Sequence, residues 1–130
     1  MSKKRVTAEH SWSRKFRNAF RGVKLGVRGE SSFFVHFFVA AMVVAAAVAL
    51  SCNLVEWCLL VSAIAAVLVA EMFNSALERM AKAVDQRHNP QLRDALDIGS
   101  AAVLLAAVGA ANVGAIVFIH RLGDVLEWWK

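Results

Sequence analysis

Two carboxylates and an amide lie on one face of a predicted helix, at the end of an apolar stretch. Glu71, Asn74 and Glu78 follow the apolar run 57–70. Helical geometry puts Glu71 and Glu78 about 20° apart around the axis, with Asn74 about one turn from each. A carboxylate at membrane depth costs about 3 kcal/mol on insertion scales, so it marks a functional site by default. We therefore treat these three residues as a candidate active site.

The composition excludes an ordinary soluble domain. Of the 130 residues 58% are hydrophobic, and the chain has one Pro and no Tyr. Three apolar segments come close to the roughly 20 residues that cross a hydrocarbon core of about 30 Å. We predict an all-α membrane protein with a single membrane domain over 1–130. Its membrane helices are predicted at 33–50, 57–84 and 98–119, and the second continues into the cytoplasm.

The basic residues orient these helices. Nine of the fifteen Lys and Arg precede the first span, four lie between the apolar part of the second helix, which ends at Leu77, and the third span, and two follow the third. Cytoplasmic loops carry the excess of Lys and Arg, so we predict the N-terminus inside and the C-terminus outside. The net charge of +5 is explained by this topology and by attraction to anionic lipid. It does not call for a nucleic-acid partner.

The residues before the first span divide into a tail and a helix. Residues 1–10 are polar and charged and are predicted to be a flexible tail. Residues 11–29 are predicted to form an amphipathic helix on the inner membrane surface. Its apolar stripe comprises Trp12, Phe16, Phe20, Val23 and Val27, with basic residues on the other faces.

Carboxylates from three segments are predicted to meet near the inner membrane surface. Glu30 precedes the first span, Glu78 lies near the inner end of the second, and Asp97 precedes the third. Such oxygen ligands suit a hard cation such as Mg²⁺ brought by a polyphosphate. The deeper Glu71 suits a general base. This combination favours phosphoryl transfer to a substrate that arrives through the lipid.

Simpler roles stay open for the peripheral carboxylates. Glu30 and Asp97, each taken alone, can be solvated helix caps. Glu78 alone can pair with Lys82, four residues further along the helix. Glu71 has no such simple role, because it is predicted to lie inside the membrane.

The third span is predicted to pack closely against other helices. It is rich in Gly, Ala and Ser, which let helices approach each other in lipid. We expect Asp94 or Asp97 to open this helix after a turn over 86–92 that Asn89 and Pro90 mark. Three helices make a thin bundle, which favours a homo-oligomer with sites between subunits.

Three short blocks carry a family resemblance. They are 71–78 (EMFNSALE), 95–103 (ALDIGSAAV) and the upstream element 30–33 (ESSF). Together they resemble the prokaryotic integral-membrane diacylglycerol kinase and undecaprenol kinase family, from about Phe16 to the end of the third span. The resemblance implies a homotrimer of three-span subunits in the bacterial inner membrane, each subunit preceded by a surface helix.

The same resemblance implies a reaction and roles for the candidate residues. The reaction is transfer of the γ-phosphate of MgATP to the hydroxyl of a membrane lipid. Glu71 is similar to the family's general base, and Asn74 to the residue that orients the base or the substrate. Glu30 and Glu78 are similar to the ligands of Mg²⁺ at the nucleotide.

Two departures from the family pattern affect the predicted nucleotide site. Asp97 is similar to a nucleotide-site residue, but Leu96 stands before it where the family usually has Lys. Lys82 stands where the family usually has Asp. We propose that Lys82 supplies the charge lost at Leu96, with Arg93 and Arg14 as further candidates. The alternative is a member that has lost its activity.

The lipid substrate is predicted less directly. Glu71, Ser75 and Ser100 are the predicted lipid-contacting residues. The run 99–103 resembles the diacylglycerol branch, whereas Glu30, Phe33 and His36 in the stretch 30–36 resemble the undecaprenol branch. We predict diacylglycerol, which would give phosphatidic acid, with undecaprenol as the alternative.

Two functions of other classes compete with a kinase. A small oligomeric transporter would use Glu71 to couple transport to protons, but such transporters typically have four spans. It would also give no reason for the basic surface helix or for carboxylates around Glu78. A structural packing protein would leave Glu71 unexplained.

Overall fold

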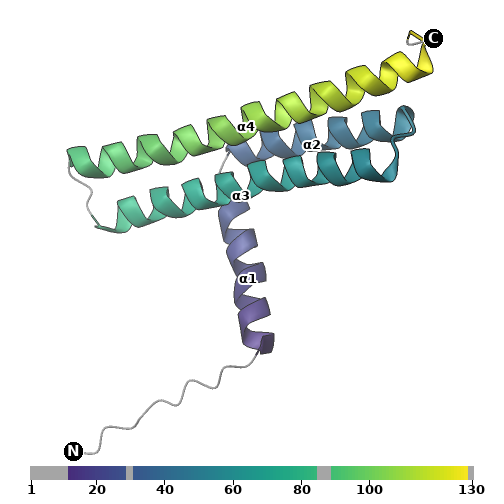
Figure 1. The fold of residues 1–130 in the computed structure, drawn as a ribbon. Coiled ribbons are helices and arrows are strands. Elements are labelled where there is room, and N and C mark those ends of the chain that lie inside the picture. Colours follow the sequence, from purple (N-terminus) through teal and green to yellow (C-terminus); the bar gives the residue numbers. More distant parts are fainter. Residues whose placement is uncertain (1–11, 29–30, 85–88, 129–130) are drawn as a thin grey trace, which may run out of the picture.

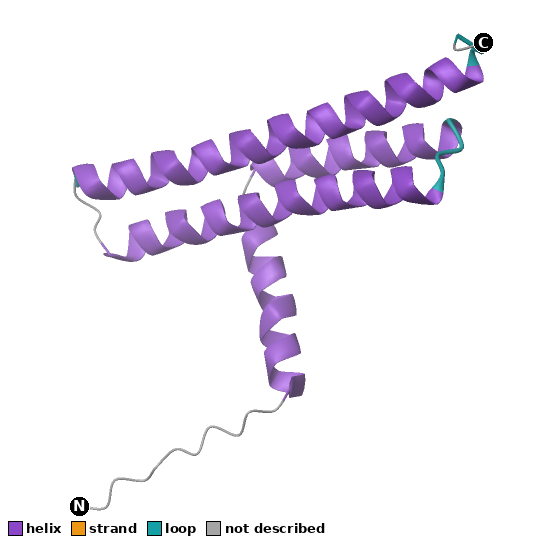
Figure 2. Ribbon diagram, in the orientation of Figure 1, coloured by secondary structure: helices purple, strands orange, loops and turns teal. Residues whose placement is uncertain are grey.

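Four α-helices make up the part of the chain that the structure describes. The computed structural model describes residues 12–28, 31–84 and 89–128. The helices are α1 (Trp12–Val27), α2 (Ser31–Ala49), α3 (Leu54–Val84) and α4 (Pro90–Val125). Helices are the sole regular elements in these three ranges (Figure 2). The predicted tail 1–10 lies outside them.

Three of these helices are long and apolar enough to cross a membrane. The candidate spans are Ser32–Ala49, Leu54–Val84 and Pro90–Val125. They lie side by side, whereas α1 leaves the bundle at a steep angle (Figure 1). The predicted all-helical fold with three candidate membrane spans is confirmed. The homotrimer stays a prediction.

The two longest helices extend well beyond α2. The lengths of α2, α3 and α4 are 19, 31 and 36 residues. At 1.5 Å per residue, α3 is about 18 Å longer than α2. The extra length projects at the end where α3 connects to α4, past the level of α1 (Figure 1). That this part of the second membrane helix lies in the cytoplasm stays a prediction.

The start of α4 differs from the sequence prediction. The helix begins at Pro90, not at Asp94 or Asp97. Asn89 is its N-cap, and its Oδ1 accepts hydrogen bonds from the backbone N–H groups of Gln91 (3.1 Å) and Leu92 (3.4 Å). Pro is favoured at the first helical position because it has no N–H to leave unpaired. Asn89 and Pro90 thus open the helix, and the predicted turn over 86–92 was wrong from Pro90 onward.

The connection from α2 to α3 is short and held on both sides. Ser51 has a φ of 52°, and the N–H of Cys52 donates to the carbonyl of Ala47 at 3.0 Å, as in a Schellman ending of α2. Asn53 and Glu56 then cap α3 reciprocally: the Asn53 N–H donates to Glu56 Oε2 (2.6 Å), and the Glu56 N–H donates to Asn53 Oδ1 (3.0 Å). The ending of α2 and the reciprocal cap of α3 together fix where α2 stops and where α3 starts.

The junction between α1 and the bundle is made by an arginine. Arg79 Nη2 donates to the carbonyl of Leu25 at 2.7 Å and to that of Arg28 at 3.1 Å. These carbonyls belong to the end of α1, where helical hydrogen bonding leaves acceptors without partners. Close by, a Cβ on Gly26 would lie 3.5 Å from Met72 Cε. The end of α1 is therefore held against the middle of α3.

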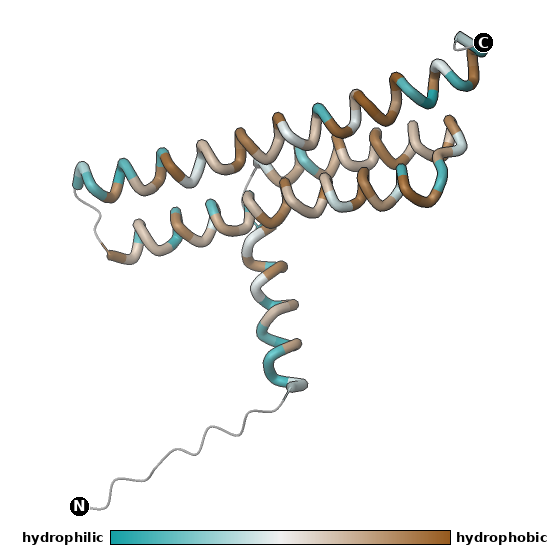
Figure 3. The backbone as a smooth tube through the Cα atoms, in the orientation of Figure 1, coloured by the Kyte–Doolittle hydropathy of each residue, from teal (hydrophilic) through white to brown (hydrophobic). Residues whose placement is uncertain are grey.

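The rest of α1 is not packed on the chain. No residue of α1 is buried, and its aromatic side chains at Trp12, Phe16 and Phe20 are 72%, 61% and 74% exposed. Apolar and polar residues alternate along it, whereas the bundle is mostly apolar (Figure 3). An exposed apolar stripe beside a basic face is typical of a helix that lies on a membrane surface.

A close contact between α3 and α4 depends on a glycine. A Cβ on Gly99 would lie 2.6 Å from Asn74 Oδ1 and 3.1 Å from Leu77 Cδ1. The first distance is too short for any Cβ, so a side chain at position 99 would displace the Asn74 amide from its present position. Gly99 thereby sets the position of Asn74.

We expect Arg79→Ala to loosen α1 from the bundle, because the carbonyls of Leu25 and Arg28 lose their donor at a cost on the order of 1–2 kcal/mol. Spin labels placed at exposed positions 20 and 80 should then show a broader distance distribution than in the parent. Arg17→Ala, which removes an exposed arginine of the same helix, is the matched control. An unchanged distribution in Arg79→Ala would show that α1 is held by something else.

Gly99→Ala is expected to destabilise the protein by about 1–3 kcal/mol, since the new methyl group overpacks the contact with Asn74. Unfolding in mixed micelles would measure the change. Gly109→Ala in the same helix is the control, because a Cβ there meets nothing within 4 Å. Equal stability of the two variants would contradict this account of the contact.

Candidate active site

Glu71 is buried between α2 and α3 and held by two side chains of α2. It is 4% exposed. Ser32 Oγ donates a hydrogen bond to Glu71 Oε1, and His36 Nε2 lies 3.8 Å from Glu71 Oε2. Ser32 and His36 are four residues apart and therefore share one face of α2. Each of them faces a different oxygen of the carboxylate, so α2 fixes the orientation of Glu71.

Asn74 lies one turn after Glu71 on α3 and binds a second carboxylate. Its Nδ2 donates to Glu78 Oε1 at 3.3 Å. Glu78 can only accept when ionised, so the amide nitrogen must be the atom that faces it. Asn74 Oδ1 then points toward Gly99, and it is buried with no hydrogen-bond partner in the described part of the chain. An acceptor left in this way costs about 1–3 kcal/mol, which is a reason to assign Asn74 a functional role.

Glu78 is much more accessible than Glu71. Its side chain is 34% exposed, and Lys82 Nζ lies 3.8 Å from its Oε2. The simpler pairing of these residues along the helix is therefore present. The Lys82 side chain is 74% exposed, and pairs at such positions contribute about 1 kcal/mol or less. A ligand in water can thus reach both residues.

The predicted nucleotide residues on α4 are exposed. Asp97 and Arg93 are both exposed, and Arg93 forms no ion pair with Glu78 in the described ranges. Ser100 is exposed too, and its Oγ donates to the carbonyl of Leu96 at 3.0 Å. Asp97 precedes Gly99 by two residues, so the antiparallel packing places it near the level of Asn74. The structure thus brings Asp97 to the level of the candidate site.

Three predicted site residues remain: Ser75, Arg14 and Glu30. Ser75 is 2% exposed on α3, next to Asn74. Arg14 is exposed on α1. Glu30, the second predicted ligand of Mg²⁺, lies outside the described residues. Among those that are described, no three His, Cys, Asp or Glu side chains are placed to hold a metal.

Glu78 nevertheless fits the metal that the sequence predicts. Mg²⁺ is usually bound through one or two carboxylates together with substrate phosphates and water. A partly exposed carboxylate such as Glu78 can supply one such ligand. The metal site stays a prediction.

The sequence alone assigned no role to Ser32. It assigned His36 no role other than its place in the stretch 30–36, which resembles the undecaprenol branch. Ser32 lies within the 30–33 element, and His36 is the sole titratable group of the first predicted span. Those were the available signals. Their contact with Glu71 joins positions at least 35 residues apart in sequence. It depends on how α2 is rotated about its axis, which the residue pattern of α2 does not reveal.

Known proteins resemble this chain over most of its length. A family model described as prokaryotic diacylglycerol kinase matches residues 17–118. Undecaprenol kinase of Bacillus subtilis (strain 168) is 26% identical over 107 residues, which cover 82% of this chain and 87% of that protein. Diacylglycerol kinase of Synechocystis sp. is 31% identical over 108 residues, which cover 82% of this chain and 62% of that protein. The match thus spans less than two thirds of the Synechocystis protein.

The family match contains the residues around Glu71 and Glu78 described above. Residues 17–118 include Glu71 with its two partners on α2, Asn74 with Gly99, and Glu78. They amount to well over half of the chain. The chain therefore belongs to the prokaryotic diacylglycerol kinase family, a family of lipid kinases.

Proposed function

We propose that this protein is an ATP-dependent kinase that transfers the γ-phosphate of ATP to the hydroxyl of diacylglycerol, giving phosphatidic acid. One observation carries the proposal: a buried carboxylate, Glu71, and a partly exposed one, Glu78, lie on one face of α3, and Asn74 between them donates to Glu78. Such an enzyme must join an alcohol dissolved in lipid to a nucleotide dissolved in water. It therefore needs one functional group that the lipid reaches and one that the dissolved nucleotide reaches.

Glu71 acts as the general base in this proposal. It takes the proton of the lipid hydroxyl while the hydroxyl oxygen forms a bond to the γ-phosphorus. The bond from that phosphorus to the bridging oxygen breaks, and ADP leaves with the electron pair. Because Ser32 already donates to Oε1, Oε2 on the side of His36 is the oxygen left to take the proton. The proton later passes to water.

Glu78 and the exposed cations serve the nucleotide. We propose that Glu78, together with Glu30, holds Mg²⁺, which when bound neutralises charge on the ATP phosphates. Asn74 keeps Glu78 in place through its amide nitrogen. Lys82, Asp97, Arg93 and Arg14 are the proposed nucleotide contacts.

The proposed setting is the bacterial inner membrane. The excess of Lys and Arg before the first span supports a cytoplasmic N-terminus and an outer C-terminus. ATP is available on the cytoplasmic side, and the proposed nucleotide residues lie on the projecting ends of α3 and α4 and on α1. We also propose that the protein works as a homotrimer.

Undecaprenol is the second candidate substrate. One specific observation favours it: His36, part of the stretch that resembles the undecaprenol branch, lies beside the proposed base. The relative from Bacillus subtilis is an undecaprenol kinase. Both lipids therefore belong in the same assay.

We expect the protein in mixed micelles to transfer labelled phosphate from ATP to diacylglycerol, and Glu71→Gln to lower the rate by at least about a hundredfold, the contribution of a general base. Glu56→Gln is the matched control. It alters another buried glutamate of α3, 8% exposed and at the far end of the helix, where Gln can still cap.

Three outcomes would contradict this proposal. Labelled undecaprenol without labelled diacylglycerol would identify the second candidate as the substrate. No labelled lipid, together with proton-driven efflux from vesicles, would overturn the kinase in favour of a transporter. Full activity of Glu71→Gln would show that the base is another group.

Lys82→Ala is expected to raise the KM for ATP about fivefold, the effect of losing a charge contact of about 1 kcal/mol, while Lys82→Arg stays close to the parent. Adding Leu96→Lys to Lys82→Ala should restore the KM if the two positions share one task. An unchanged KM would refute the compensation. A lower KM would mean that Lys82 only competes with the nucleotide's metal for Glu78.

A further inference from the structure

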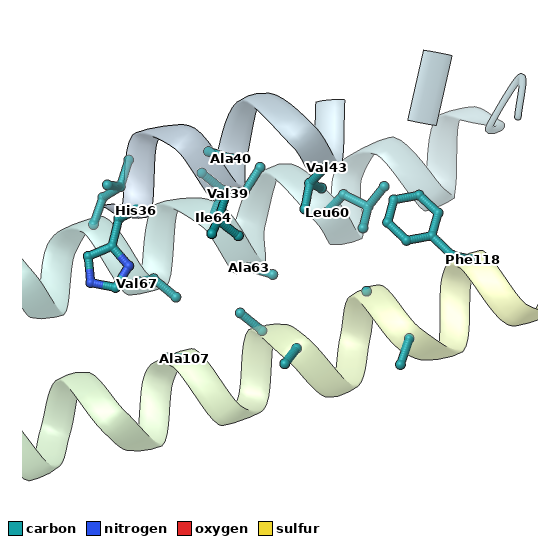
Figure 4. A pocket seen from close by; sticks show the side chains of 15 residues that line it. His36, Val39, Ala40, Val43, Leu60, Ala63, Ile64, Val67, Ala107 and Phe118 are labelled. Atoms are coloured by element: carbon teal, nitrogen blue, oxygen red, sulfur yellow. The ribbon is translucent and has the colours of Figure 1, made fainter. Parts of the chain in front are cut away.

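An apolar cavity of about 310 Å³ lies between α2, α3 and α4 (Figure 4). This is within the range of about 300–1,000 Å³ that is usual for small-molecule sites. Its walls are Val, Leu, Ile, Ala, Gly and Phe side chains, and His36 is its single polar lining residue. The cavity therefore suits a hydrocarbon ligand with a polar group at one end.

The polar end of the cavity adjoins the proposed base. His36 and Val67 lie at one end of the cavity, and Phe118 lies at the other (Figure 4). His36 Nε2 is 3.8 Å from Glu71 Oε2. A molecule that fills the cavity and ends at His36 would present that end to Glu71.

The length of the cavity matches one leaflet of a membrane. On α4 it is lined from Ala107 to Phe118, a rise of about 17 Å. Half of the hydrocarbon core is about 15 Å. The small residues of α4 keep this space open, since a Cβ on the lining residue Gly114 would meet nothing within 4 Å.

We propose that this cavity binds the hydrocarbon chain of the lipid substrate and thereby delivers its hydroxyl to Glu71. The inference rests on the proposed function and assigns its lipid-chain site. The surrounding lipid is as apolar as the cavity wall, so moving a hydrocarbon chain from the lipid into the cavity contributes little free energy. The cavity acts instead on position: a chain that fills it to the end near Phe118 fixes where its hydroxyl lies.

A helix of a second copy is the competing occupant, and its size argues against it. An α-helix is about 10–12 Å across with its side chains. A single hydrocarbon chain is narrow enough to enter.

Gly114→Leu tests the site, because it places a side chain in the cavity about 10 Å from Ala107 by helical rise. A long chain must pass this point, whereas a short chain ends before it. We expect kcat/KM for dioleoylglycerol to fall about tenfold or more and that for dihexanoylglycerol to stay unchanged. If undecaprenol is the lipid that the protein phosphorylates, undecaprenol and geraniol form the matched pair.

Gly109→Leu is the control for this variant. It makes the same change in the same helix at a position that is also open but does not line the cavity. It should leave both lipids unaffected. Equal effects of Gly114→Leu on the long and the short lipid would overturn the proposal. Dissociation of the oligomer by this variant would assign the cavity to a contact between copies.

A photoreactive lipid tests binding in the cavity separately from lipid phosphorylation. A diacylglycerol with a diazirine at the end of its chain should label residues near Phe118 and Gly114, located by mass spectrometry. Lipid phosphorylation with labelling elsewhere would overturn the cavity site alone. Labelling of the cavity without phosphorylation would overturn the proposed function and leave the binding site standing.

Discussion

The structure depends on one buried carboxylate and on what surrounds it. A charged group away from water is tolerated only where it is hydrogen-bonded or paired. Glu71 meets this condition through the hydroxyl of Ser32 and the nearby imidazole of His36. Both side chains come from α2, so the need to satisfy Glu71 fixes the rotation of α2 against α3. The same need determines which residues face the cavity.

From Glu71 the polar groups continue toward water along α3. Asn74 lies one turn further on and is held in position by the close approach of α4 at Gly99. Its amide nitrogen reaches Glu78, which is partly exposed. One face of α3 therefore carries a buried carboxylate, Glu71, and, two turns further along, a partly exposed one, Glu78. Arg79 leaves this face and ties α1 to the same level of the bundle.

The sequence predicted the features that depend on composition and local pattern. Helical fold, three spans and the burial of Glu71 follow from long apolar runs. The start of α4 was wrong because Asn89 and Pro90 suit both a turn and a helix N-terminus, and only the bonds from Asn89 to Gln91 and Leu92 distinguish them.

The sequence alone did not predict which residues meet between neighbouring helices. A helix that is apolar on every side, as α2 nearly is, gives no sign of which face its neighbours cover. Ser32 and His36 were therefore missed as partners of Glu71. Gly99 was recognised as a small residue, but not as the one that α3 must approach. The pairing of Glu78 with Lys82 was foreseen, because residues four apart on a helix meet whatever surrounds them.

The placement of Glu71 also bears on the competing transporter. A proton-coupled carrier must expose its carboxylate to each side of the membrane in turn. Glu71 leads toward water in one direction, through Asn74 and Glu78. In the other direction lies the cavity, whose lining beyond His36 is entirely apolar and has no group that could pass a proton on. A one-sided polar route that ends at an apolar cavity suits an enzyme that receives a lipid at one end and a nucleotide at the other.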